Sequence, residues 1–171
     1  MSDFPQAGDP MPEVAMETPD GGTVKPSDFR GRKLAVFFYP KDNTPGCTTE
    51  AKDFTALAGE FEKAGVALLG VSKDSPQKHR NFIAKHDLKV PLATDAEQGG
   101  LSDALGVWGE KKMYGKTFMG MIRSTYLVDA HGKIARSAGQ SARAAASTSS
   151  AWPATFTLGQ TRAIFPSSST R

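Results

Sequence analysis

The sequence predicts an α/β protein in which helices flank a central mixed β-sheet. Residues 34–39 and 66–71 form two continuous apolar runs, which are typical of strands covered on both faces. Each run is followed by a capping residue and a proline, Thr44-Pro45 and Ser75-Pro76, and this pair is typical of a helix start. The alternation of buried strand and helix therefore favours a layered α/β architecture.

Shorter segments complete the predicted fold. The turn sequence Asp20-Gly21-Gly22 separates two short extended segments, so we expect an N-terminal β-hairpin. Further along the chain we expect a strand near 90–93, a short helix near 98–105 and a closing pair of strands at 124–128 and 133–136.

The composition divides the chain into residues 1–136, expected to be one domain, and a tail of residues 137–171. The tail is rich in Ser, Thr and Ala, and its 35 residues contain no Asp, Glu, Lys or His. No helical apolar stripe is visible in it. We therefore expect the tail to be disordered, or to arise from a reading-frame slip.

The charge distribution argues against several classes of partner. The sequence pI is about 9.0, but all 18 acidic residues and all but three of the 21 basic residues precede Ser137. Residues 1–136 are thus electrically balanced, and we expect no nucleic-acid or membrane partner. The sequence shows no basic segment followed by an apolar run at its start, and no apolar stretch of about 18 residues, so we expect a cytoplasmic protein.

The chain has one cysteine, Cys47. A single cysteine excludes an internal disulfide and a zinc site of several cysteines, and we expect neither a metal nor another cofactor. Cys47 occupies the third position of the helix that follows the first buried strand, where free backbone N–H groups and the helix dipole favour a thiolate. Gly46 would let a substrate approach the backbone, and Thr44 can place its hydroxyl beside the sulfur. An inert buried cysteine remains the alternative at this point.

The stretch Pro40-Lys-Asp-Asn-Thr44-Pro-Gly-Cys47 resembles the peroxiredoxin active-site signature P-x-x-x-T-x-x-C. The resemblance extends over residues 5–136 and points to the bacterioferritin-comigratory, or peroxiredoxin Q, branch. Other matching segments are Phe-Tyr-Pro-Lys before the signature, and Gly106-Val-Trp-Gly-Glu and Gly115-Lys-Thr after it.

This resemblance implies a thioredoxin-like fold and a peroxidase that reduces hydrogen peroxide and alkyl hydroperoxides. Cys47 would be the nucleophile, and the arginine that the family uses from a later strand corresponds to Arg123. A free thiol with a pKa of about 8.5 is a few per cent thiolate at pH 7, so full ionisation gains at most roughly 30-fold, or about 2 kcal/mol. Alignment of the O–O bond and stabilisation of the departing oxygen must supply the rest.

We therefore hypothesise a polar cradle made by Arg123, the Cys47 N–H and the Thr44 hydroxyl, with Pro40 shielding the thiolate from water. Glu50 either orients Arg123 or favours the helix start, and both interpretations stay open.

The chain departs from the resembled branch because it lacks a second cysteine. The usual positions of the resolving cysteine hold Lys52 and Ile83. We therefore expect a one-cysteine cycle in which an external thiol reduces the sulfenic acid, with thioredoxin, glutaredoxin or glutathione as reductant. The alternative functions are a peroxide sensor and a redox-regulated chaperone that use the same cysteine. We expect a monomer or weak homodimer.

Three further features of the sequence are not expected to take part in catalysis. Residues 109–117 resemble a phosphate-binding loop but have five residues between the glycines where that motif needs four. His79, His86 and His131 have no metal-ligand spacing and are expected on the surface. Ala138-Gly139-Gln140 stands where the family often has Trp-Pro, which is the basis for suspecting a reading-frame slip after about Ser137.

Overall fold

The computed structural model describes residues 4–63 and 65–138, apart from the side chains at positions 46, 50, 60, 113 and 136–138. The prediction for the tail therefore lies outside the described residues from position 139 onward. Backbone pairing is described as far as Ala138, where the last strand ends.

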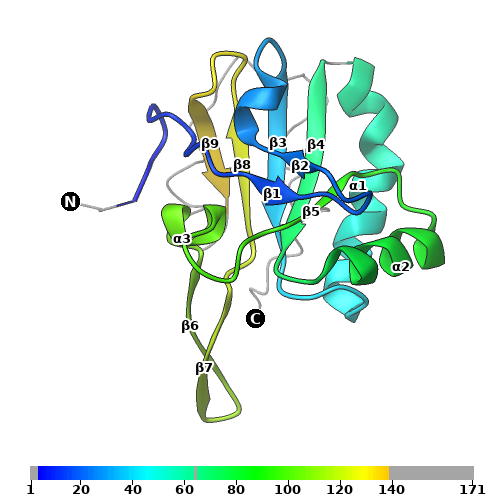
Figure 1. The fold of residues 1–171 in the computed structure, drawn as a ribbon, viewed down its shortest axis with the longest axis vertical. Coiled ribbons are helices and arrows are strands. Elements are labelled where there is room, and N and C mark those ends of the chain that lie inside the picture. The colour runs from blue at the N-terminus through cyan, green and yellow to red at the C-terminus, as the bar shows by residue number, and fades with distance from the viewer. Residues whose placement is uncertain (1–3, 64, 139–171) are drawn as a thin grey trace, which may run out of the picture.

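A seven-stranded mixed sheet forms the centre of the fold (Figure 1). Its strands, in spatial order, are β2 (Thr23–Val24), β1 (Met16–Glu17), β5 (Leu92–Thr94), β4 (Val66–Ser72), β3 (Lys33–Phe38), β8 (Ser124–Val128) and β9 (Ile134–Ala138). The pairs β3–β4 and β4–β5 are parallel and the other pairs are antiparallel. The predicted central mixed sheet and N-terminal hairpin are confirmed.

Helices cover both faces of this sheet. They are the 3-10 helix η1 (Pro26–Phe29) and the α-helices α1 (Pro45–Lys63), α2 (Pro76–His86) and α3 (Leu101–Leu105). Residues of α1 and α2 share one apolar cluster, and residues of α3 belong to the cluster on the opposite face. The predicted cap-and-proline start of α2 is confirmed, because Ser75 Oγ accepts the Lys78 N–H at 3.2 Å and Pro76 is the first helical residue.

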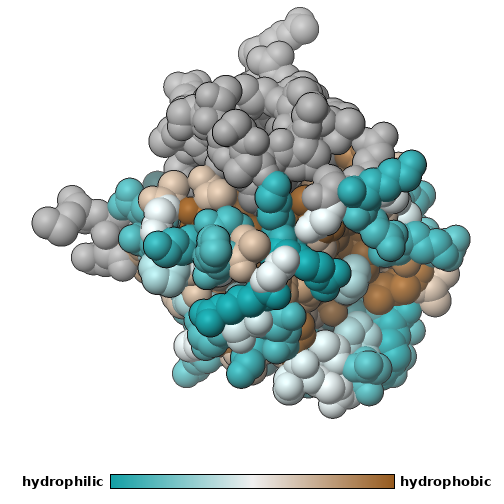
Figure 2. All heavy atoms as spheres, turned by 90° about the horizontal axis from the view of Figure 1, so that it is seen from above, coloured by the Kyte–Doolittle hydropathy of each residue, from teal (hydrophilic) through white to brown (hydrophobic). Residues whose placement is uncertain are grey.

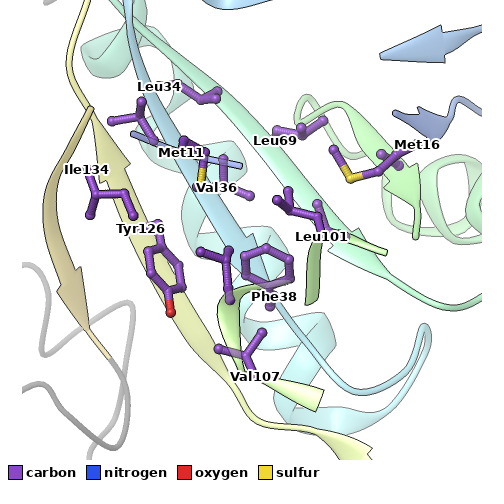
Figure 3. Packing of buried hydrophobic residues seen from close by; sticks show 14 of the residues in the cluster. Met11, Met16, Leu34, Val36, Phe38, Leu69, Leu101, Val107, Tyr126 and Ile134 are labelled. Carbon is purple, nitrogen blue, oxygen red and sulfur yellow. The ribbon is translucent and has the colours of Figure 1, made fainter. Parts of the chain in front are cut away.

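Strand β3 lies between the two apolar clusters. Ala35 and Phe37 face α1, where Phe37 stacks on Phe54 with ring centroids 4.3 Å apart. Leu34, Val36 and Phe38 face the other way, into the cluster drawn in Figure 3. Both faces of this strand are covered, as the continuous apolar run in the sequence predicted.

A hairpin absent from the sequence-based prediction follows α3. Strands β6 (Trp108–Met113) and β7 (Lys116–Met121) pair only with each other among the described residues and extend away from the main sheet (Figure 1). The residues between them, Tyr114 and Gly115, have φ values of 54° and 76°. Two positive φ angles are the requirement of a type I′ hairpin turn, for which a glycine in the second position is well suited.

Some element boundaries differ from those predicted. The helix expected near 98–105 begins at Leu101, because the buried Asp95 carboxylate accepts the N–H groups of Leu101 at 2.8 Å and Ser102 at 2.9 Å. The last strand spans Ile134–Ala138, so it continues two residues past the predicted domain end.

The described helices include none long and apolar enough to cross a membrane. Figure 2 shows the molecule from the end at which α1 finishes, and hydrophobic residues are visible there between hydrophilic ones. Both kinds of residue are ordinary on the surface of a globular protein.

Candidate active site

The site lies where the central strand β3 passes into helix α1. After β3, the Tyr39 N–H donates to the Val71 carbonyl at 3.1 Å, so this part of the chain stays beside β4. A short loop then leads to α1, whose first turn includes the backbone hydrogen bond from Thr48 N–H to the Thr44 carbonyl at 2.8 Å. Cys47 therefore sits in the first turn of α1, at the carboxyl end of a buried parallel strand.

The Cys47 sulfur is enclosed by apolar side chains and approached by one guanidinium. Cys47 is 2% exposed and belongs to the same cluster as Phe37 and Phe54. Arg123 Nη2 donates to Cys47 Sγ at 3.1 Å, from the segment that joins β7 to β8. A cationic donor at this distance stabilises a thiolate, and an apolar surrounding strengthens the interaction.

The other predicted site residues occupy the loop and the first turns of α1. The Thr44 hydroxyl donates to the Lys41 carbonyl at 3.0 Å, and Pro40 is half-buried. Gly46 and Glu50 lie in the backbone of α1, but the Glu50 side chain is outside the described part of the structure. Its predicted contact with Arg123 therefore stays a prediction.

Lys111 is a second cation near Cys47 that the sequence-based analysis missed. The Lys111 side chain packs over the backbone of Gly120, where a Cβ added to that glycine would lie 2.9 Å from Lys111 Cδ. The Lys111 ammonium donates to the Met121 carbonyl at 2.9 Å. Burial lowers the pKa of Lys111, the Arg123 charge lowers it further, and the Cys47 charge opposes both. The two-residue Tyr-Gly turn was the signal that could have placed Lys111 on a hairpin.

His79 is buried, so the prediction of a surface histidine is wrong at this position. Its exposed fraction is 0%, and its Nδ1 lies 2.7 Å from the Asp42 carboxylate in the loop before Cys47. His86 is partly exposed and His131 is exposed, as predicted. The carboxylate partner of His79 lies 37 residues earlier in the chain, so no local spacing in the sequence indicates it.

Titratable groups do not gather into a metal site anywhere in residues 4–63 and 65–138. No group of three or more His, Cys, Asp or Glu side chains in that part of the chain could hold a metal ion. The chemistry available at the site is that of one sulfur, two nearby cations and the backbone N–H groups of a helix start.

A cysteine in the first turn of the helix after the central strand, with an arginine at its sulfur, defines the class of thioredoxin-like peroxiredoxins. Comparison with protein families agrees, because the model of the AhpC/TSA family matches residues 7–137. The chain belongs to the AhpC/TSA family.

Individual relatives point to one branch of this family. Peroxiredoxin Bcp of Bacillus subtilis and that of Escherichia coli K12 are each 43% identical over 129 residues, which are 75% of this chain and 82% of the relative. The structure of the bacterioferritin comigratory protein of Xanthomonas campestris is 39% identical with a TM-score of 0.72, covering 78% of this chain and 87% of that one. A cysteine variant of PrxQ from Xylella fastidiosa has a TM-score of 0.74 at 33% identity, over 81% and 88% of the two chains. The predicted peroxiredoxin Q branch and thioredoxin-like fold are confirmed.

Proposed function

We propose that the chain is a thiol-dependent peroxidase that reduces hydrogen peroxide and alkyl hydroperoxides through Cys47. The observation that carries the proposal is the 3.1 Å hydrogen bond from Arg123 to the sulfur of a cysteine in the first turn of α1. Membership of the AhpC/TSA family supports it. The Xanthomonas campestris relative is described by its alkyl peroxide reduction activity, which supports the inclusion of alkyl hydroperoxides.

In the first step the Cys47 thiolate attacks the terminal oxygen of the hydroperoxide. A sulfur–oxygen bond forms, the O–O bond breaks, and the two electrons come from sulfur. The departing oxygen takes a proton and leaves as water or an alcohol, and Cys47 becomes a sulfenic acid. Thiol and hydroperoxide together thus give sulfenic acid and alcohol, with no other reactant.

The polar groups around the sulfur would lower the barrier of this step. Arg123 would hold the thiolate before the reaction and donate to the peroxide oxygens as negative charge moves onto them. The Thr44 hydroxyl, now turned to Lys41, and the Cys47 N–H would complete the cradle. Pro40 would limit water beside the sulfur, and Gly46 would let the peroxide approach the backbone.

The second half of the cycle requires a thiol from outside the chain, because the chain has one cysteine. An external thiol attacks the sulfenic sulfur and releases water, forming a mixed disulfide. A second thiol then attacks this disulfide and returns Cys47 to the reduced form. We propose thioredoxin, glutaredoxin or glutathione as the reductant.

Steady-state peroxide consumption tests the proposal. Wild type is expected to turn over many equivalents of hydrogen peroxide or an alkyl hydroperoxide with dithiothreitol, and Cys47→Ser is expected to lose that turnover entirely. A His131→Gln variant, altered in the exposed turn after β8, serves as the matched control and should keep it. Equal consumption by wild type and Cys47→Ser would refute the nucleophile assignment, and a single stoichiometric oxidation would indicate a sensor.

The physiological reductant and the assembly state need separate measurements. Turnover should be repeated with glutathione, with glutaredoxin and glutathione, and with thioredoxin and its reductase, each at matched thiol concentration. Sedimentation velocity checks the predicted monomer or weak homodimer. The cytoplasmic location stays a prediction.

A further inference from the structure

A buried polar network lies directly beneath the active-site loop. We refer to its members as the loop clamp, which consists of Tyr39, Asp42, Asp74 and His79. Tyr39 follows β3, Asp42 belongs to the loop before Cys47, Asp74 follows β4 and His79 lies in α2. The clamp therefore joins the loop to three neighbouring elements, and the peroxidase chemistry proposed above uses none of its side chains.

Asp42 is the central member, because both its carboxylate oxygens and its backbone N–H are engaged. Its carboxylate accepts the Tyr39 hydroxyl at 2.6 Å on one oxygen and faces His79 Nδ1 at 2.7 Å on the other. Its backbone N–H donates to Asp74 Oδ2 at 2.8 Å. Asp74 Oδ2 also accepts the Ser72 hydroxyl at 2.7 Å, which fixes the receiving carboxylate.

Both ring nitrogens of His79 have a hydrogen-bond partner. His79 Nε2 is 3.1 Å from the Ala93 carbonyl, which only accepts hydrogen bonds, so Nε2 must carry a hydrogen. His79 Nδ1 and the Asp42 oxygen then share one further proton across 2.7 Å, because neither a bare imidazole nitrogen nor a carboxylate can donate. The contact is thus a buried hydrogen bond between helix α2 and the loop.

A second contact holds the same loop from the surface. His86, about two turns further along α2 than His79, lies with Nε2 3.1 Å from Asn43 Oδ1. Asn43 has a φ of 62°, a left-handed conformation that asparagine adopts more readily than most residues. Two consecutive loop residues, Asp42 and Asn43, are therefore fixed to one helix.

We propose that the loop clamp positions the active-site loop for peroxide reduction, with Asp42 and His79 as positioning residues. The inference rests on the function proposed above. Asp42 lies between Pro40 and Thr44, so its fixation sets where both residues stand relative to Cys47. Errors of about 1 Å in such positions cost on the order of 100-fold in rate.

The chemistry of the clamp fits positioning better than stability. Burying two carboxylates and a histidine is costly, and well-packed apolar residues often stabilise a fold as well or better. Burial, followed by the Asp42 charge, raises the pKa of Tyr39 well above its ordinary value, so its hydroxyl remains a donor. Hydrogen bonds are directional, so each bond of the clamp fixes the position of one atom of Asp42 in the loop.

Two rate constants measured on each variant test the proposal: that of Cys47 with hydrogen peroxide, and that of its alkylation by iodoacetamide. Cys47 is 2% exposed, so a displaced loop should admit the alkylating agent while weakening the peroxide reaction. His79→Gln is expected to lower the peroxide rate by roughly 10- to 100-fold and to raise the alkylation rate. Tyr39→Phe loses one hydrogen bond and should shift both rates in the same directions by roughly 2- to 10-fold.

Two controls separate positioning from general destabilisation. His131→Gln changes an exposed histidine and should leave both rates at wild-type values. Ile134→Val weakens the apolar cluster on the opposite face and should lower the melting temperature without moving either rate.

Two outcomes would overturn the inference. Peroxide rates within twofold of wild type in folded His79→Gln and Tyr39→Phe would overturn it, and so would an equal fall of both rates, which indicates lost thiolate. If His79→Gln does not fold, Tyr39→Phe decides by the same two rates. A wild type no faster with peroxide than free cysteine would refute the proposed function, and the alkylation rates would still test whether the clamp holds the loop.

Discussion

Replacing Arg123 by Met tests how much of the peroxide reaction depends on the guanidinium at the sulfur. The substitution keeps an unbranched side chain but removes the donor that lies 3.1 Å from Cys47 Sγ. A hydrogen bond to a charged group contributes about 1.5–3 kcal/mol. If that energy is lost from the transition state, the second-order rate constant with peroxide falls by roughly 10- to 150-fold.

The assay is single-turnover loss of the Cys47 thiol after mixing with a small excess of peroxide, stopped at set times with a thiol reagent. Arg123→Lys keeps the charge without the planar fork and is expected to fall between wild type and Arg123→Met. Arg80→Met is the matched control, because Arg80 is an exposed arginine of α2 that donates to Pro19 and Gln77 instead. A rate for folded Arg123→Met within twofold of wild type would show that the guanidinium contributes little to the peroxide reaction.

Two further predictions concern stability. The fold lowers the pKa of Lys111, so the charged form of this lysine destabilises the folded state at neutral pH. This destabilisation disappears as the pH rises towards 10.5, because the lysine then loses its charge. The free energy of unfolding of wild type should therefore rise relative to that of Lys111→Met between pH 7 and about 10, and parallel urea-unfolding curves would contradict this. Gly70→Ala should cost about 1–3 kcal/mol, because the new Cβ would lie 2.6 Å from Phe37 Cζ and 2.7 Å from Leu92 Cδ2 in the packed core. An unchanged melting temperature would show that these side chains can move.

The sequence was sufficient to predict the central strands and the cysteine because their signals are local. A continuous apolar run marks a strand covered on both faces, and a threonine-proline pair marks the start of α1 within three residues of Cys47. Arg123 was found only through resemblance to a family. No local rule connects it to a sulfur 76 residues earlier.

Other features were missed because their causes are not local. The β6–β7 hairpin has exposed polar residues such as Lys112 and Lys116, so it lacks the apolar run that indicated the other strands. The only local sequence signal for this hairpin is its two-residue turn, Tyr114-Gly115. His79 was misplaced on the surface because a buried histidine requires partners, and its partners Asp42 and Ala93 come from distant parts of the chain.

If Cys47 is a nucleophile activated by its place in the fold, it should take an oxygen atom from peroxide faster than a free thiol does. The most direct measurement is the rate at which reduced protein, given one equivalent of hydrogen peroxide, gains a single oxygen atom on Cys47, with the sulfenic acid trapped by dimedone and located by mass spectrometry. Trapping is expected at Cys47, at a rate far above that of free cysteine in the same buffer. A rate equal to that of free cysteine, or an oxygen atom gained on methionine instead, would contradict it.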